Sequence, residues 1–194
     1  KPFLKAQVVD VHDFSVRTPE ALATDANVLM FSTYDRYDQQ RLLGQQVPFD
    51  GRVDAYLRYE KRARAAGSVL WVSLFGVFEF LRTVEIAELK ILWARLEPAA
   101  AAGDFSGFEP KAVRRRAGEG YRDVQERILT YAQQIEKRFR LLDTPGSFIE
   151  KIQGFRAAWL GSVSDPGDAL IVANARVNGI NNIISDDQDL STVD

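Results

Sequence analysis

The chain has 194 residues, of which 46% are apolar and 27% charged, and its formal net charge at pH 7 is −2. This length and this apolar fraction are enough for one domain with a substantial core. Because the sequence contains no cysteine and one histidine, it excludes disulfides, thiolate nucleophiles, cysteine-bound zinc and histidine-rich metal sites. No apolar run reaches the ~20 residues of a membrane span, and no signal-peptide pattern opens the chain. We therefore expect a cytoplasmic protein without a membrane segment.

In the first part of the chain, apolar runs alternate with amphipathic stretches. Residues 1–17 fit either an edge strand or an extended arm. Residues 22–25 predict a strand that ends on Asp25, and a helix is expected directly after it. Residues 34–48 are polar and glutamine-rich, and they predict a helix end and a loop. Helical periodicity returns over residues 53–66.

The next elements have clear boundary signals. The β-branched and aromatic residues 69–72 predict a second strand. Ser73 suits the N-cap of the helix that follows, which is expected over residues 74–96 and ends before Pro98. Residues 99–107 are rich in alanine and glycine and predict a linker.

The last part of the chain repeats the same alternation. Residues 141–144 predict a short strand and residues 147–160 an amphipathic helix. A further helix is expected over residues 166–177, with the Asn-Gly pair at 178–179 as its end, and residues 180–185 predict the last strand. Strands that alternate with helices predict an α/β fold with a central parallel sheet between two helical layers.

Residues 68–81 are almost wholly apolar and hold one charged side chain in their interior, Glu79. Because an unpaired buried carboxylate is costly, we expect Glu79 to be protonated, paired or bound to a metal ion. Asp25, Asp168 and Asp187 also lie next to apolar runs, and the carboxyl ends of parallel strands share one edge of a sheet. Acids gathered there would repel one another without a cation, which favours Mg²⁺ or Mn²⁺.

Taken singly, three of these acids have simpler explanations. Asp25 fits a turn at a strand end, Asp168 fits the dipole at a helix N-terminus, and Asp187 fits a turn. Glu79 has no comparable local explanation, because its apolar neighbours predict that it has little contact with solvent.

Positive charge is concentrated in residues 111–140, which carry nine Lys or Arg and four Asp or Glu, a net charge of +5. One interpretation is a surface for a phosphate backbone, and the other is a solvated helix face with ion pairs along it. The candidate nucleic-acid-binding residues are Lys111, Arg114, Arg115, Arg116 and Arg122.

Four motifs in this order resemble the PIN-domain family of metal-dependent nucleases: TDANVLMF, VSLFGVFEF, DPGDALIVANA and NNIISDDQDL. Family members have an Asp at the end of the first strand, a Glu on a following helix preceded by a Ser, an Asp that opens a later helix, and a Thr/Ser-x-Asp-x-Asp turn. The resemblance implies that the catalytic and metal-binding acids are Asp25, Glu79, Asp168 and Asp187 (with Asp186 as the alternate to Asp187), and that Asn27 and Ser185 brace the site.

The resemblance implies a PIN-like domain over residues 1–194 that hydrolyses RNA phosphodiester bonds as an endoribonuclease with Mg²⁺ or Mn²⁺. Asp25 and Asp187 are expected to hold the ion. Asp168 is expected to hold or bridge it, and Glu79 to bind it or to orient the attacking water.

Residues 98–140 are interpreted as a basic helical insertion in this domain, longer than the middle region of the toxin-like members. Those members imply an antitoxin or another protein partner, and PIN-like proteins often form homodimers. An RNA substrate is the main expected partner.

Two other functions fit parts of the sequence. A haloacid-dehalogenase-like phosphatase would use Asp25 as its nucleophile, but it needs a second acid at position 27, where this chain has Asn27. A non-catalytic PIN-like module would bind RNA or a protein through residues 111–140.

Overall fold

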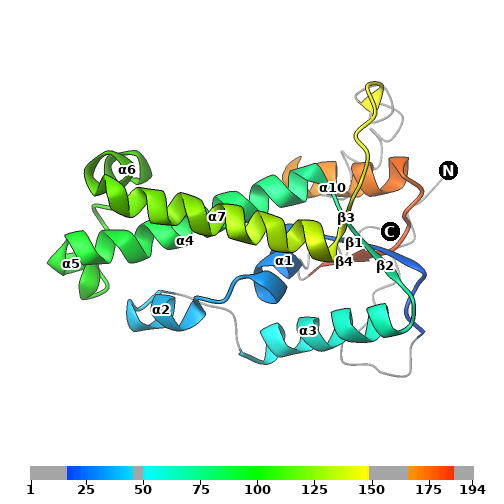
Figure 1. Ribbon diagram of the computed structural model, residues 1–194, viewed down its shortest axis with the longest axis horizontal. Helices are drawn as coiled ribbons and strands as arrows, with labels where there is room; N and C mark the ends of the chain where they lie inside the picture. The colour runs from blue at the N-terminus through cyan, green and yellow to red at the C-terminus, as the bar shows by residue number, and fades with distance from the viewer. Residues whose placement is uncertain (1–16, 46–49, 149–165, 186–194) are drawn as a thin grey trace.

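The computed structural model describes residues 17–45, 50–148 and 166–185 of the chain. Within these residues, the centre is a four-stranded sheet in which all neighbouring strands are parallel, in the order β3-β2-β1-β4 (Figure 1). The strands are β1 (Ala21–Thr24), β2 (Val69–Val72), β3 (Arg140–Leu141) and β4 (Ile183–Ile184). The structure thus confirms the predicted α/β class with a parallel sheet.

Helices surround this sheet and follow its strands along the chain (Figure 1). Their bounds are α1 (Ala26–Thr33), α2 (Tyr37–Leu42), α3 (Asp50–Ala65), α4 (Leu74–Leu96), α5 (Pro98–Ala101), α6 (Pro110–Ala117), α7 (Glu119–Arg138) and α10 (Pro166–Val177). Among the described helices, none combines the length and the apolar composition that crossing a membrane requires.

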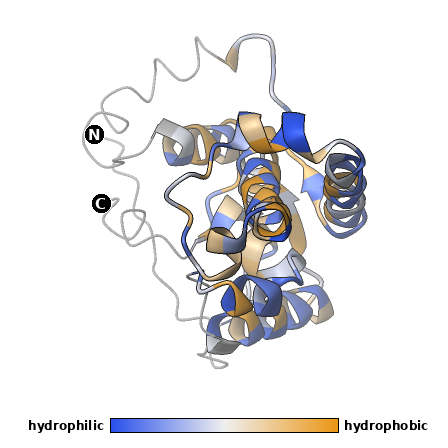
Figure 2. Cartoon of the chain, turned by 90° about the vertical axis from the view of Figure 1, so that its left-hand side faces the viewer, coloured by the Kyte–Doolittle hydropathy of each residue, from blue (hydrophilic) through white to orange (hydrophobic). Residues whose placement is uncertain are grey.

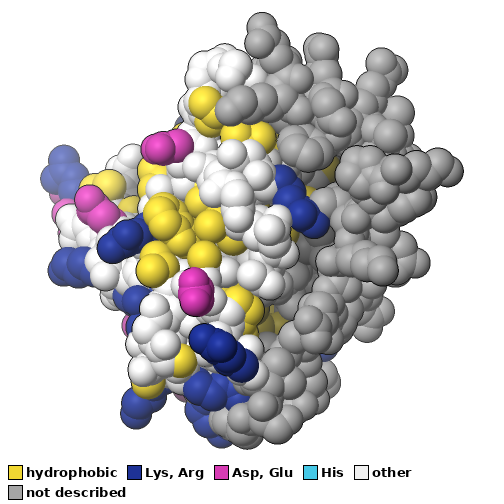
Figure 3. Space-filling model, turned by 90° about the vertical axis from the view of Figure 1, so that its right-hand side faces the viewer, with side chains coloured by type: hydrophobic (Ala, Val, Ile, Leu, Met, Phe, Trp, Pro, Cys, Tyr) yellow, Lys and Arg dark blue, Asp and Glu magenta, His cyan; other side chains and the backbone are white. Residues whose placement is uncertain are grey.

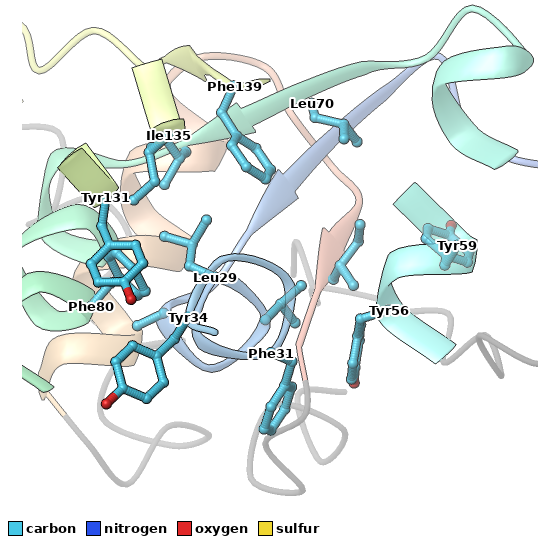
Figure 4. Close-up of a cluster of buried hydrophobic side chains, with 14 of the residues drawn as sticks. Leu29, Phe31, Tyr34, Tyr56, Tyr59, Leu70, Phe80, Tyr131, Ile135 and Phe139 are labelled. Atoms are coloured by element: carbon cyan, nitrogen blue, oxygen red, sulfur yellow. The ribbon is translucent and has the colours of Figure 1, made fainter. Parts of the chain in front are cut away.

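One face of the sheet packs against α1, α3, α4 and α7. Leu22 of β1, Leu70 of β2 and Ile184 of β4 contribute to the same buried cluster as side chains of these helices. Figure 4 shows its larger members, which come from the helices and the residues next to them: Leu29, Phe31, Tyr34, Tyr56, Tyr59, Phe80, Tyr131, Ile135 and Phe139. This is the main hydrophobic core of the described residues.

The opposite face packs against α10. Because side chains alternate between the two faces of a strand, Ala23 points away from the cluster that holds Leu22. Ala23 lies instead with Ala175 of α10 and with Ile180, and Ile183 packs against them. Helices therefore cover both faces of the sheet, in agreement with the predicted three-layer α/β/α arrangement.

Several boundaries agree with the sequence signals. The bounds of β2, α4 and α10 are those predicted, and the Ser73 hydroxyl accepts a hydrogen bond from the Gly76 amide at 2.9 Å as the N-cap of α4. Gly67 follows α3 with a φ of 83°, a left-handed conformation that glycine adopts at little cost.

Other boundaries differ from the prediction. The polar segment over 34–48 contains the helix α2, and the predicted linker over 99–107 begins inside α5. The strands predicted over 141–144 and 180–185 are shorter or shifted. Only residues 140–141 and 183–184 of these regions pair with a neighbouring strand. The arm predicted over 1–17 and the helix predicted over 147–160 lie almost wholly outside the described residues.

Helices α4 and α7 extend together away from the sheet and carry α5 and α6 at the far end (Figure 1). With 23 residues, α4 spans about 35 Å. Figure 2 views the molecule from this end and shows hydrophobic and hydrophilic residues on the same helices. The far end has a core of its own, in which Leu89 and Leu92 of α4 pack with Val113 of α6 and Val124 of α7.

Two glutamates of α4 anchor its neighbours. Glu88 is 1% exposed and accepts a hydrogen bond from the Tyr34 hydroxyl at 3.1 Å, while Arg36 and Arg127 form ion pairs with it. Burial raises the pKa of Glu88 above its ordinary value despite these partners. The carboxylate therefore joins the segment after α1 and the middle of α7 to α4.

Glu85 lies one turn before Glu88 and accepts hydrogen bonds from a residue of α6. Arg114 donates two hydrogen bonds to its carboxylate, at 2.9 and 2.8 Å, and the Tyr121 hydroxyl donates a third at 2.8 Å. Burial by itself raises the pKa of Glu85, but the hydrogen bonds from Arg114 and Tyr121 outweigh it and lower the pKa below its ordinary value.

The lowered pKa of Glu85 predicts how stability depends on pH. A carboxyl group with a depressed folded-state pKa stabilises the fold above its unfolded pKa of about 4.3 and loses this contribution as pH falls through the folded-state value. Urea unfolding should therefore show Glu85→Gln to be less stable than wild type at pH 7, with the difference shrinking below about pH 4. Glu126→Gln, at an exposed position of α7, is the control. A difference that does not change with pH would contradict the ion-pair account.

Arg138, at the end of α7, predicts a second stability effect. Its guanidinium pairs with Glu60 of α3 and donates to the Ser32 carbonyl and the Thr33 hydroxyl of α1, both at 2.9 Å. Arg138→Ala should lower the free energy of unfolding by about 1.5–3 kcal/mol, because charged hydrogen bonds to two helices are lost. The neighbouring exposed Lys137→Ala should stay within about 0.5 kcal/mol of wild type. Equal values for the two variants in urea unfolding would refute this role.

Candidate active site at the carboxyl edge of the sheet

Asp25 lies at the carboxyl end of the central strand β1 and is 2% exposed. Its Oδ1 accepts a hydrogen bond from the Val28 amide at 2.8 Å, as an N-cap of α1 does, and the Ser185 hydroxyl donates to its Oδ2. Its own amide donates to the Ile184 carbonyl at 3.1 Å. The carboxylate is thus held in one orientation by the start of α1 and the end of β4. The predicted position of Asp25 at the carboxyl end of the first strand is confirmed.

Tyr56 of α3 contacts Ser185, the residue that donates to Asp25. Its hydroxyl donates to the Ser185 carbonyl at 3.2 Å, and its ring stacks on Phe31 with 5.3 Å between centroids. Tyr56 is not among the site residues predicted from the sequence. Its spacing within α3 indicates a buried face, but no local pattern indicates a hydrogen bond to a residue 129 positions away.

The N-terminal turn of α4 approaches this edge closely. A Cβ at Gly76 would lie 3.4 Å from Ser73 Oγ, 3.6 Å from Ile171 Cδ1 of α10 and 3.8 Å from the Thr24 carbonyl. These are ordinary contact distances, and they place the first turn of α4 beside the end of β1 and against α10. Since α10 leads into β4, which is parallel to β1, its first turn lies at the same edge. The positive ends of α1, α4 and α10 converge there.

Glu79 and Asp168 lie on these helices but are not buried. Asp168, in the first turn of α10, is half-buried, and Glu79, in the second turn of α4, is exposed. The expectation that apolar neighbours bury Glu79 is therefore wrong. On a helix only one face meets the core, so Phe80 is fully buried while Phe78 is 63% exposed and Glu79 faces solvent.

The described acids do not assemble the predicted metal site by themselves. In the part of the chain that the structure describes, no three His, Cys, Asp or Glu side chains lie close enough to hold one ion. On the end of the molecule shown in Figure 3, acidic side chains lie apart from one another around a hydrophobic area. The predicted ligand Asp187 and its alternate Asp186 lie outside the described residues. The donors that are present, carboxylates and a hydroxyl, are the oxygen ligands that Mg²⁺ and Mn²⁺ take.

No known relative decides the function. Neither protein-family models nor curated proteins nor solved structures give a match to this chain. Membership of the PIN-domain family stays a prediction from the motifs.

The remaining predicted residues have less direct roles. Asn27 has an exposed side chain in the first turn of α1. Arg114 pairs with Glu85, and Arg116 pairs with Glu97. The other three predicted nucleic-acid-binding residues are exposed cations at the far end of the molecule: Lys111, Arg115 and Arg122. Two of the five predicted cations therefore form ion pairs within the fold.

Ser185 provides a test of the geometry around Asp25. Ser185→Ala should lower the free energy of unfolding by about 1.5–3 kcal/mol, because the buried carboxylate loses a donor. The exposed Ser106→Ala should stay within about 0.5 kcal/mol of wild type in the same urea unfolding experiment. If Ser185→Ala is as stable as the control variant, the hydroxyl does not stabilise the Asp25 carboxylate.

Proposed function

We propose that the protein is a Mg²⁺- or Mn²⁺-dependent endoribonuclease with a PIN-like domain. The observation that carries this proposal is the buried Asp25 at the carboxyl end of the central parallel strand, hydrogen-bonded to Ser185 at the end of the neighbouring strand. In open parallel sheets, ligands bind at this edge, outside the carboxyl ends of the strands.

The described acids differ in how far they are buried. Asp25 is buried, Asp168 is half-buried and Glu79 is exposed, the last two near the starts of their helices. A buried carboxylate with hydrogen-bonded oxygens suits the anchor of a cation, and more exposed carboxylates can meet a cation and a substrate from solution. We assign Asp25 and Asp168 to metal binding, Glu79 to metal binding or orientation of the attacking water, and Asp187 to the remaining ligand position.

A bound ion would supply a water of lowered pKa and would neutralise charge on the phosphate. The positive ends of the nearby helices favour the same negative substrate. RNA, rather than DNA, is proposed on the resemblance of the four motifs, and an RNA substrate implies a cytoplasmic location. An antitoxin-like partner and a homodimer belong to the same proposal.

A second candidate is a non-catalytic module that binds RNA or a protein. It is favoured by the scattered acids of the described residues and by the exposed cations Lys111, Arg115 and Arg122. Binding of RNA without any cleavage in Mn²⁺ would favour this second function over the first.

Asp25→Asn tests the nuclease directly. The amide can still cap α1, because Asn and Asp are similarly good N-caps, so the fold should persist. Loss of the carboxylate should reduce Mn²⁺-dependent cleavage of a labelled single-stranded RNA by more than about 100-fold, since even outer partners of metal ligands contribute 10–100-fold.

Two controls accompany this assay. Asp123→Asn makes the same charge change at an exposed site on α7 and should leave cleavage unchanged. Thermal unfolding should show Asp25→Asn to be folded at the assay temperature. Full cleavage activity in Asp25→Asn would refute the assignment.

A further inference from the structure

Helix α4 has an exposed hydrophobic strip next to the candidate active site. Leu74 is 37% exposed and Phe78 is 63% exposed, although both lie in the first two turns of a helix that is otherwise well packed. At about 100° per residue, Leu74, Phe78 and Arg82 lie on one face of the helix, within a sector of about 80°. Arg82 is also exposed, so the strip ends in a positive charge.

The same face of α4 leads to the basic helix α6. Glu85 follows Arg82 on this face, about 10 Å along the helix from Phe78. Arg114 of α6 donates two hydrogen bonds to Glu85. The Arg114–Glu85 contact brings α6 to this face, and the same helix carries the exposed cations Lys111 and Arg115. The face thus runs from the carboxyl edge of the sheet to the basic helix α6.

The chemistry of this face suits a single nucleic-acid strand. Proteins that bind single strands combine aromatic side chains, on which bases stack, with positive charges that follow the phosphates. The face has both features, because the exposed Phe78 is followed along α4 by Arg82 and then by the cations of α6. The two exposed apolar side chains are a small area compared with the roughly 800 Å² that each partner buries in a standard protein interface.

We propose that single-stranded RNA binds along this face of α4, with one base stacked on Phe78 and its phosphates beside Arg82 and the exposed cations of α6. This inference rests on the proposed nuclease function, because it gives the RNA a path from the candidate site to α6. It assigns to Phe78 and Arg82 a role in binding and not in catalysis.

The test measures binding without turnover. Fluorescence anisotropy with a labelled single-stranded RNA in EDTA should show Phe78→Ala to bind about tenfold more weakly than wild type, the loss expected for one stacked base. Phe78→Trp should keep the affinity of wild type, because tryptophan also stacks. Leu129→Ala, which truncates a side chain of α7 that is equally 63% exposed, should not change the affinity.

A second pair of variants tests the charge. Arg82→Ala should weaken binding and reduce its salt dependence, since one phosphate contact is lost. Arg95→Ala removes an exposed arginine from another face of α4 and should change neither. Thermal unfolding of all variants checks that they remain folded.

The outcomes separate this inference from the proposed function. If the protein cleaves RNA in Mn²⁺ but Phe78→Ala binds like wild type in EDTA, the binding face is wrong and the nuclease stands. If RNA binds in EDTA with the expected losses but Mn²⁺ gives no cleavage, the binding face stands alone. A wild-type protein that binds no RNA, or that uses this face to self-associate in a way that Phe78→Ala disrupts, overturns the inference.

Discussion

The buried carboxylate of Asp25 is the interaction on which this edge of the sheet depends. A carboxylate that is 2% exposed is stable only when protein donors or a cation replace the lost water. Two of its donors, the Val28 amide and the Ser185 hydroxyl, come from the start of α1 and the end of β4. Asp25 therefore fixes the ends of two neighbouring strands relative to each other, and Tyr56 ties α3 to the same place.

The long helix α4 connects this edge with the rest of the molecule. Its first turn packs between β1 and α10, and its last turns pack with α6 and α7. Glu85 and Glu88 make its middle a polar anchor for Arg114 and for Tyr34. These two charged residues thus add hydrogen bonds and ion pairs to the apolar contacts of the helix. The same helix offers an exposed face from the sheet edge towards the basic end of the molecule.

Local chemistry made part of this structure predictable. The sequence predicts the bounds of β2 and α4 well, because the signals for them are local. These signals are the β-branched residues of β2, the Ser73 cap at the start of α4 and the proline after its end. The position of Asp25 followed from the strand before it. The burial predicted for Glu79 is wrong because a helix buries only one face, even where the residues around it are apolar. The support from Tyr56 joins distant segments and leaves no local pattern. Asp186 and Asp187 lie outside the described residues, so the predicted fourth ligand stays a prediction.

The most direct test of the central claim is a crystal of the protein soaked with Mn²⁺ and measured for anomalous scattering. The account predicts an anomalous peak at coordination distance from the Asp25 carboxylate, with Asp168 and an acid from 186–187 among its other ligands, and no such peak in crystals of Asp25→Asn. A map without a peak at Asp25 in the wild-type protein, with Mn²⁺ bound elsewhere or not at all, would contradict the metal-dependent nuclease.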